Sequence, residues 1–64
     1  MSRASKKRSP RERAARALCV LAGNPENIPF DGKPIWMSFL PDADAALKAA
    51  LTPEEWERIE AEGP

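Results

Sequence analysis

The chain has 64 residues and no net charge, because ten lysines and arginines balance ten aspartates and glutamates. A chain of this length forms one small domain at most and buries only about 60% of the surface of its unfolded form. It contains one cysteine and no histidine, which excludes an internal disulfide and leaves a single thiol, too few ligands for a zinc site.

Residues 1–8 are polar and basic, with no large apolar side chain after Met1. This composition predicts a disordered basic arm that precedes a single helical domain at residues 9–64. Residues 1–16 hold seven basic side chains against one acid, whereas residues 42–64 hold seven acids against two bases. The zero net charge is therefore a cancellation between a basic beginning and an acidic end.

The first helix is expected over residues 9–22. Ser9 can cap it, Pro10 suits the first helical position, and Glu12 stands where a capping box needs it. Gly23 is expected to end the helix in the left-handed conformation. Its buried face is predicted from apolar residues at helical spacing, with Arg13 and Arg16 on another face. The apolar residues are Ala14, Ala17, Leu18 and Leu21, with Cys19 and Ala22 beside them.

Residues 24–35 are predicted to form an ordered, proline-rich loop. The pair Asp31-Gly32 can close a hairpin, but Pro29 and Pro34 remove donors from a strand ladder and argue against that interpretation. The loop also contains side chains that are too apolar for a solvated linker and are expected to fold back onto the helices, namely Ile28, Phe30 and Ile35.

Residues 36–40 predict a single helical turn, and two further helices are expected at 41–50 and 53–62. The last helix has the clearest start, because Thr52 can cap it, Pro53 takes the first position and Glu55 completes a capping box. Leu51 and Trp56 occupy the two positions of a hydrophobic staple. The predicted fold is therefore all-α, a small three-helix domain with a proline-rich loop and a disordered arm.

The basic residues at the beginning of the chain are the first functional candidates, because they can neutralise phosphates without reading a base sequence. The candidate contacts to nucleic acid or another polyanion are Arg3, Lys6, Lys7, Arg8, Arg11, Arg13 and Arg16. Arg11 and Arg13 stand in the first turn of a helix, where the dipole disfavours positive charge, and this favours a partner. A solubilising tail explains the same run of charge equally well.

Trp36, Glu60 and Glu62 are the candidate residues for a protein interface. Trp36 lies between a proline-rich loop and a helix, where it can anchor a partner, although packing in the core is the favoured interpretation for both tryptophans. Glu60 and Glu62 lie near the end of a helix at which the dipole disfavours acids. The two charged ends can also attract each other, within one chain or between chains.

Catalysis is not expected, and neither a cofactor nor a metal is predicted. Cys19 has no histidine to activate it, and Asp42 and Asp44, two positions apart on a helix, point in different directions. The chain has no glycine-rich phosphate loop and no serine elbow. No apolar run approaches the ~20 residues of a membrane span, so a membrane partner is not expected either.

A loose pattern runs over about residues 14–51. It consists of Ala17-Leu18-Cys19, Gly23-Asn24-Pro25, Asp31-Gly32-Lys33-Pro34, Trp36 and Leu40-Pro41. In this pattern the chain resembles small uncharacterised open reading frames of bacterial phages and prophages. The resemblance implies a cytoplasmic accessory protein made in a bacterium, and it supplies no catalytic residues.

Two functions remain open at this point. The first is a non-catalytic binding protein that acts by contact with another protein or with its own copies. By extension of the resemblance, it would be a phage accessory factor that modulates a host complex. The alternative is a nucleic-acid-binding protein that uses the basic arm and the first helix.

Overall fold

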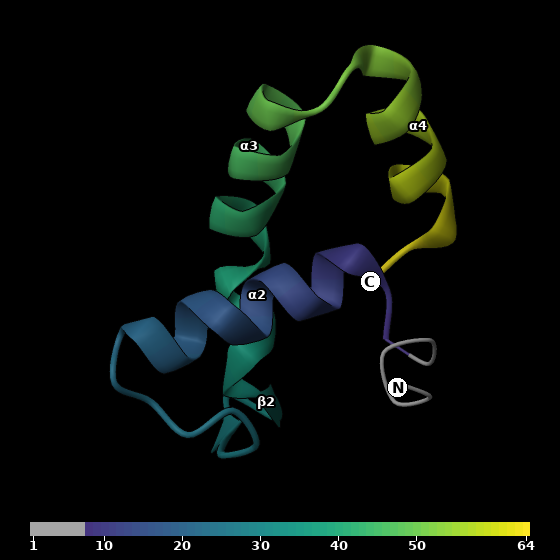
Figure 1. Ribbon diagram of the computed structural model, residues 1–64. Coiled ribbons are helices and arrows are strands. Elements are labelled where there is room, and N and C mark those ends of the chain that lie inside the picture. Colours follow the sequence, from purple (N-terminus) through teal and green to yellow (C-terminus); the bar gives the residue numbers. More distant parts are fainter. Residues whose placement is uncertain (1–7) are drawn as a thin grey trace, which may run out of the picture.

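The computed structural model describes residues 8–64, and in this part of the chain it is mostly helical with a small sheet (Figure 1). The elements are α2 (Pro10–Leu21), β1 (Pro29–Phe30), β2 (Lys33–Pro34), the 3-10 helix η1 (Ile35–Phe39), α3 (Leu40–Ala50) and α4 (Pro53–Glu62). The three predicted helices and the short aromatic turn are confirmed. An all-α fold is not, because two short strands pair. The predicted arm, apart from Arg8, lies outside the described residues.

Helix α2 is capped by Ser9 and ends before Gly23, as the sequence predicts, but only half of the predicted capping box forms, because the Glu12 carboxylate accepts from Arg16 at 2.7 Å. The Ser9 hydroxyl accepts a hydrogen bond from the backbone N–H of Glu12 at 3.1 Å. At the other end, Gly23 has φ of 90°, and the N–H of Asn24 donates to the carbonyl of Cys19 at 3.1 Å. This 6→1 bond satisfies a carbonyl that the end of a helix otherwise leaves unpaired.

The loop after α2 contains a β-hairpin, and the prediction against a hairpin is wrong. β1 and β2 pair antiparallel. Asp31 and Gly32 form the two-residue turn with φ of 58° and 81°. Positive φ at both positions matches the twist of the flanking strands, and Asp-Gly adopts it more readily than most pairs.

The two prolines fit the hairpin because of its register. Pro29 lies opposite Pro34, and one pair farther from the turn the N–H of Ile35 donates to the carbonyl of Ile28 at 2.8 Å. Antiparallel pairs alternate between hydrogen-bonded and non-hydrogen-bonded, so the proline pair occupies a position at which no N–H is needed. The prolines therefore remove no bond from this ladder.

The core lies where α2 crosses η1 and α3 (Figure 1). The buried residues at this crossing are Ala15, Cys19, Trp36 and Ala43. Three of the four are small, so the helices approach closely and Trp36 supplies the one large buried side chain among residues 8–64. Trp36 is therefore a core residue in the described fold.

The buried side of α2 agrees with the predicted one only in part: Ala14 and Leu18 pack against the core, but the most buried positions lie beside them. Ala15 and Cys19, four residues apart, are fully buried, whereas Ala17 is exposed and Leu21 is 82% exposed. Two positions along a helix correspond to a rotation of about 200°, which places Ala17 opposite Ala15. Close approach to η1 and α3 favours small side chains at the two fully buried positions, and the larger Leu18 packs at the edge of this face.

Two of the three apolar loop residues do not fold back onto the helices. Ile28 is 45% exposed and Phe30 is 57% exposed, while Ile35 packs against the core. The hairpin accounts for this difference, because its strands pair with each other instead of lying along a helix.

Helix α4 has a complete capping box. The Thr52 hydroxyl accepts from the N–H of Glu55 at 3.1 Å, and the Glu55 carboxylate accepts from the N–H of Thr52 at 2.9 Å. This backbone hydrogen bond is the largest cause of a lowered pKa at Glu55, followed by the bond with the Thr52 side chain. A hydrogen bond to the charged carboxylate favours its ionised form.

The lowered pKa of Glu55 has a consequence for stability against acid. A carboxylate whose folded pKa lies below its unfolded value stabilises the fold above the unfolded value, and this contribution is lost as pH falls through the folded pKa. We expect an NMR titration of Glu55 to show a midpoint below 4.5, the ordinary value. The midpoint should stay low in Thr52→Val, because the backbone bond is retained. A midpoint at or above 4.5 in the wild type would contradict the capping geometry.

Candidate functional site

Arg16, in the middle of α2, is the centre of a polar cluster. Its Nε donates to Glu12 at 2.7 Å, and its Nη1 donates to Glu26 at 3.1 Å and to Asn27 at 3.3 Å. The guanidinium also lies over the Trp36 ring, 5.0 Å from the ring centroid. The cluster connects the loop after α2 to the helix by hydrogen bonds. It also covers the ring of Trp36, the one large core side chain of the described fold.

The environment of Arg16 favours the charged form of its guanidinium group. Burial lowers the pKa of Arg16, but the hydrogen bonds to Glu12 and Glu26 together raise the pKa by more, so it lies above its ordinary value. Its side chain is only 15% exposed. Arg16 therefore has a structural role in the described fold and offers little surface to a phosphate.

Arg11 is bound in a similar way at the start of α2. Its Nε and Nη2 donate to the two carboxylate oxygens of Asp44 at 2.8 and 2.7 Å. This two-pronged bond to Asp44 is the largest cause of the raised pKa of Arg11, and the charge of Glu60 adds to it. The pair joins α2 to α3 across 33 positions of sequence, and it explains a basic residue in the first turn of a helix.

The remaining predicted polyanion contacts are divided between two parts of the chain. Arg13 is exposed on α2, and Arg8 has a half-exposed side chain 4.0 Å from Glu12. The other three predicted contacts lie outside the described residues, and they are Arg3, Lys6 and Lys7. The structure thus does not gather the seven residues into one open basic face, because Arg11 and Arg16 are engaged within the fold.

The three predicted interface residues are found in different environments. Trp36 is buried, with 7% of its surface exposed, and Arg16 covers its ring. Glu60 and Glu62 are exposed near the end of α4. Cys19 is fully buried, and its thiol lies 3.7 Å from the carbonyl oxygen of Asn24. The buried thiol packs in the core and faces no open site.

A different group of exposed side chains was not predicted as a site. Within residues 8–64, the exposed large apolar side chains all lie in the stretch from position 20 to position 30. We call this group the apolar end, and its members are Val20, Leu21, Ile28 and Phe30. The sequence does contain a signal for Phe30, since a residue beside a two-residue turn lies at the tip of a hairpin.

A shallow pocket of about 250 Å³ adjoins the apolar end. Phe30 and Pro34 of the hairpin, Met37 of η1 and Leu40 of α3 supply its apolar lining. Asp31 and Lys33 contribute polar groups at the turn. An apolar lining with a few polar groups suits the side chain of a protein partner better than a phosphate.

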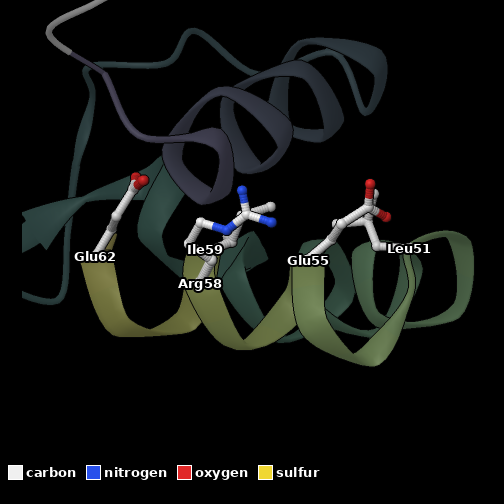
Figure 2. A pocket seen from close by; sticks show the side chains of 5 residues that line it. All are labelled: Leu51, Glu55, Arg58, Ile59 and Glu62. Carbon is white, nitrogen blue, oxygen red and sulfur yellow. The ribbon is translucent and has the colours of Figure 1, made fainter.

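Helix α4 is the least firmly packed helix of the described fold. It has no buried residue, and Trp56 and Ile59 are only half-buried, so Trp56 is not the core residue that the sequence favoured. A pocket of about 270 Å³ runs along one side of the helix (Figure 2). Its lining consists of Leu51, Glu55, Arg58, Ile59 and Glu62.

Two findings bear on other kinds of site. Residues 8–64 contain no group of three or more cysteine, aspartate or glutamate side chains arranged to hold a metal ion. Among the helices in this range, none has the length and apolar character needed to cross a membrane. Comparison of the chain with protein-family models, with curated proteins and with solved structures gives no match.

Proposed function

We propose that this protein is a non-catalytic binding module that contacts a protein partner through the apolar end. The observation that carries the proposal is the concentration of exposed large apolar side chains between Val20 and Phe30. Single exposed apolar residues are ordinary on soluble proteins, so we take these four, which lie close together in the chain, as one contact region. Burial of such side chains against a partner is the main source of binding free energy.

The hairpin supplies a plausible anchor for the contact. Phe30 stands beside the turn, 57% exposed, next to the pocket lined by Met37 and Leu40. The exposed Phe30 ring can enter a recess of the partner, and the pocket beside it can accept an apolar side chain of the partner. A partner with a complementary apolar side chain and recess can engage both.

The charges of the described residues favour this function over nucleic-acid binding by the fold. Residues 8–64 hold all ten acids but only seven of the ten basic side chains. Arg11 and Arg16 form ion pairs of 3.1 Å or less, and Arg8 lies 4.0 Å from Glu12. Polyanion binding then depends on Arg8, Arg13 and the basic residues before them, and it is the competing function.

The resemblance to phage and prophage reading frames suggests the class of partner. An accessory protein of this kind acts in the cytoplasm of a bacterium, and we propose a component of a host complex as the protein bound. The resemblance covers about residues 14–51, and this range includes the residues that form the hairpin and its pocket.

Affinity capture from the native host, at two salt concentrations and with or without nuclease, tests this function. We expect the wild type to retain one defined protein at both salt concentrations and after nuclease treatment. The double variant Leu21→Ser/Phe30→Ser should bind about thirtyfold more weakly, since the loss of anchor residues costs about 2 kcal/mol or more. The matched control is Ala45→Ser/Ala49→Ser, which changes two exposed positions of α3 and should bind as the wild type does.

The same experiment identifies the competing function. Capture that disappears after nuclease and falls steeply with salt would assign the protein to nucleic-acid binding and overturn the proposed function. Equal capture by the wild type and the Leu21→Ser/Phe30→Ser variant would also overturn it, because the apolar end would then play no part.

A further inference from the structure

The pocket of about 250 Å³ beside the hairpin has one acidic and one basic side chain in its lining, Asp31 and Lys33. Both residues are exposed, and neither forms an ion pair at 4.0 Å or less with any of residues 8–64. Only Gly32 separates them, so the two opposite charges lie close together at the hairpin turn. The pocket therefore combines an apolar lining with one charge of each sign, and neither charge is paired within the described fold.

Phe30 both protrudes from the hairpin and lines this pocket. Its ring is 57% exposed, and the residue pairs with Lys33 across the hairpin. Paired residues of two antiparallel strands have their side chains on the same face, so Phe30 and Lys33 share a face. Met37 and Leu40 supply further apolar walls of the pocket. A phenyl ring from another molecule can therefore pack between Phe30 and these two side chains.

The charges of the pocket favour one kind of occupant. A surface with charge of a single sign repels a second copy of itself and needs a partner of the opposite sign. A surface with one charge of each sign is complementary to its own copy, because a two-fold axis places residue i opposite residue j and residue j opposite residue i. The buried core of the described fold has only four residues, so an association that buries more apolar surface also stabilises the chain.

We propose that a second copy of this chain occupies the pocket, in a two-fold symmetric dimer formed by the two hairpins. The Phe30 ring of each copy packs against Met37 and Leu40 of the other copy, and Asp31 of each copy pairs with Lys33 of the other. Because Phe30 also belongs to the apolar end, the inference rests on the proposed function and adds a means of regulating it. A protein partner that binds Phe30 competes with the second copy, so dissociation of the dimer controls access to the hairpin.

Sedimentation equilibrium of the purified full chain at low salt, from about 10 µM to about 1 mM, tests the dimer. The contact is small, and we expect a dissociation constant of roughly 0.1 mM. Phe30→Ala should weaken association about thirtyfold, because each dimer loses two exposed rings. The matched control is Leu21→Ala, which removes a more exposed apolar side chain outside the pocket and should associate as the wild type does. A wild type that stays monomeric over the whole range, or equal losses in the two variants, would overturn the proposal.

Reversal of the two charges gives the sharpest outcome. Asp31→Lys and Lys33→Glu each place like charges opposite each other in the dimer, so each variant alone should associate about tenfold more weakly than the wild type. An equimolar mixture of the two variants should regain the wild-type affinity, because both positions then face an opposite charge in the mixed dimer. A mixture that stays as weak as its components would contradict the two-fold pairing.

The hairpin is monitored in each charge variant by NMR. Pro29 and Pro34 form a non-hydrogen-bonded pair, which brings their α-protons together, so a nuclear Overhauser effect between them reports the register. If lysine at position 31 abolishes this signal, Asp31→Asn takes its place, because asparagine tolerates the positive φ of this position. Its mixture with Lys33→Glu restores one of the two charge pairs and should associate more tightly than Lys33→Glu alone. No gain in this mixture would overturn the dimer.

The dimer and the proposed function fail separately in these experiments. Self-association is measured on the purified chain, whereas capture requires a protein of the host. Loss of self-association with capture intact would overturn the dimer alone, and a dimer without any captured protein would overturn the proposed function alone. If both hold, Leu21→Ala should weaken capture and leave self-association unchanged, because Leu21 lies outside the pocket.

Discussion

Replacement of Trp36 by alanine is expected to unfold most of the protein at 25 °C. Trp36 is the one large side chain buried in the crossing of α2, η1 and α3, and the other core residues there are small. Loss of a buried tryptophan costs about 3–5 kcal/mol. A domain of this size has a total stability of roughly 3–10 kcal/mol at 0.05–0.15 kcal/mol per residue. We expect the lower end of that range, because the buried core of the described fold has only four residues, so little or none remains.

Thermal and urea unfolding followed by far-ultraviolet circular dichroism measures this loss. The matched control is Trp56→Ala, since Trp56 is half-buried on α4 and makes no contact with the core cluster. It should keep a cooperative transition close to that of the wild type. A Trp36→Ala protein that melts within a few degrees of the wild type would show that the core does not depend on the α2–η1 crossing.

Replacement of Arg16 by methionine is expected to lower the free energy of unfolding by about 2 kcal/mol. Methionine retains much of the aliphatic packing but removes the hydrogen bonds to Glu12 and Glu26 and the charge above Trp36. A hydrogen bond to a charged group contributes about 1.5–3 kcal/mol when its partners are partly buried, and exposure of Glu26 reduces the sum.

Two control variants separate the effect of losing this cluster from the effect of losing a positive charge from α2. Arg13→Met removes the same charge from an exposed position of the same helix, and its effect should stay within about 0.5 kcal/mol. Arg16→Lys should not restore the wild-type stability, because an ammonium group cannot donate to Glu12, Glu26 and Asn27 in the observed planar arrangement. Equal effects of Arg13→Met and Arg16→Met would contradict the cluster.

The engagement of Arg11 and Arg16 also narrows where a polyanion can bind. Both residues lie in α2, and both donate to carboxylates of the same fold. Of the seven basic residues predicted to contact a polyanion, the five that remain lie within the first 13 positions, and Lys33, Lys48 and Arg58 are exposed elsewhere on the fold.

The ends of the helices were determined by the sequence, because the signals that set them are local. Ser9, Gly23 and the Thr52–Glu55 pair each act on backbone groups within four residues, and the structure confirms all of them. The functional candidates were less predictable. Their positions in the chain are clear, but whether a basic side chain is open or engaged depends on residues that are distant in sequence.

Tertiary structure decided three features that no local signal contains. The buried side of α2 follows the small residues Ala15 and Cys19, because the approach of η1 and α3 sets the space available. The prolines enter a hairpin because its register places them opposite each other. Arg11 meets Asp44 across 33 positions because α2 crosses α3 there, and that crossing turns a predicted phosphate contact into an internal ion pair.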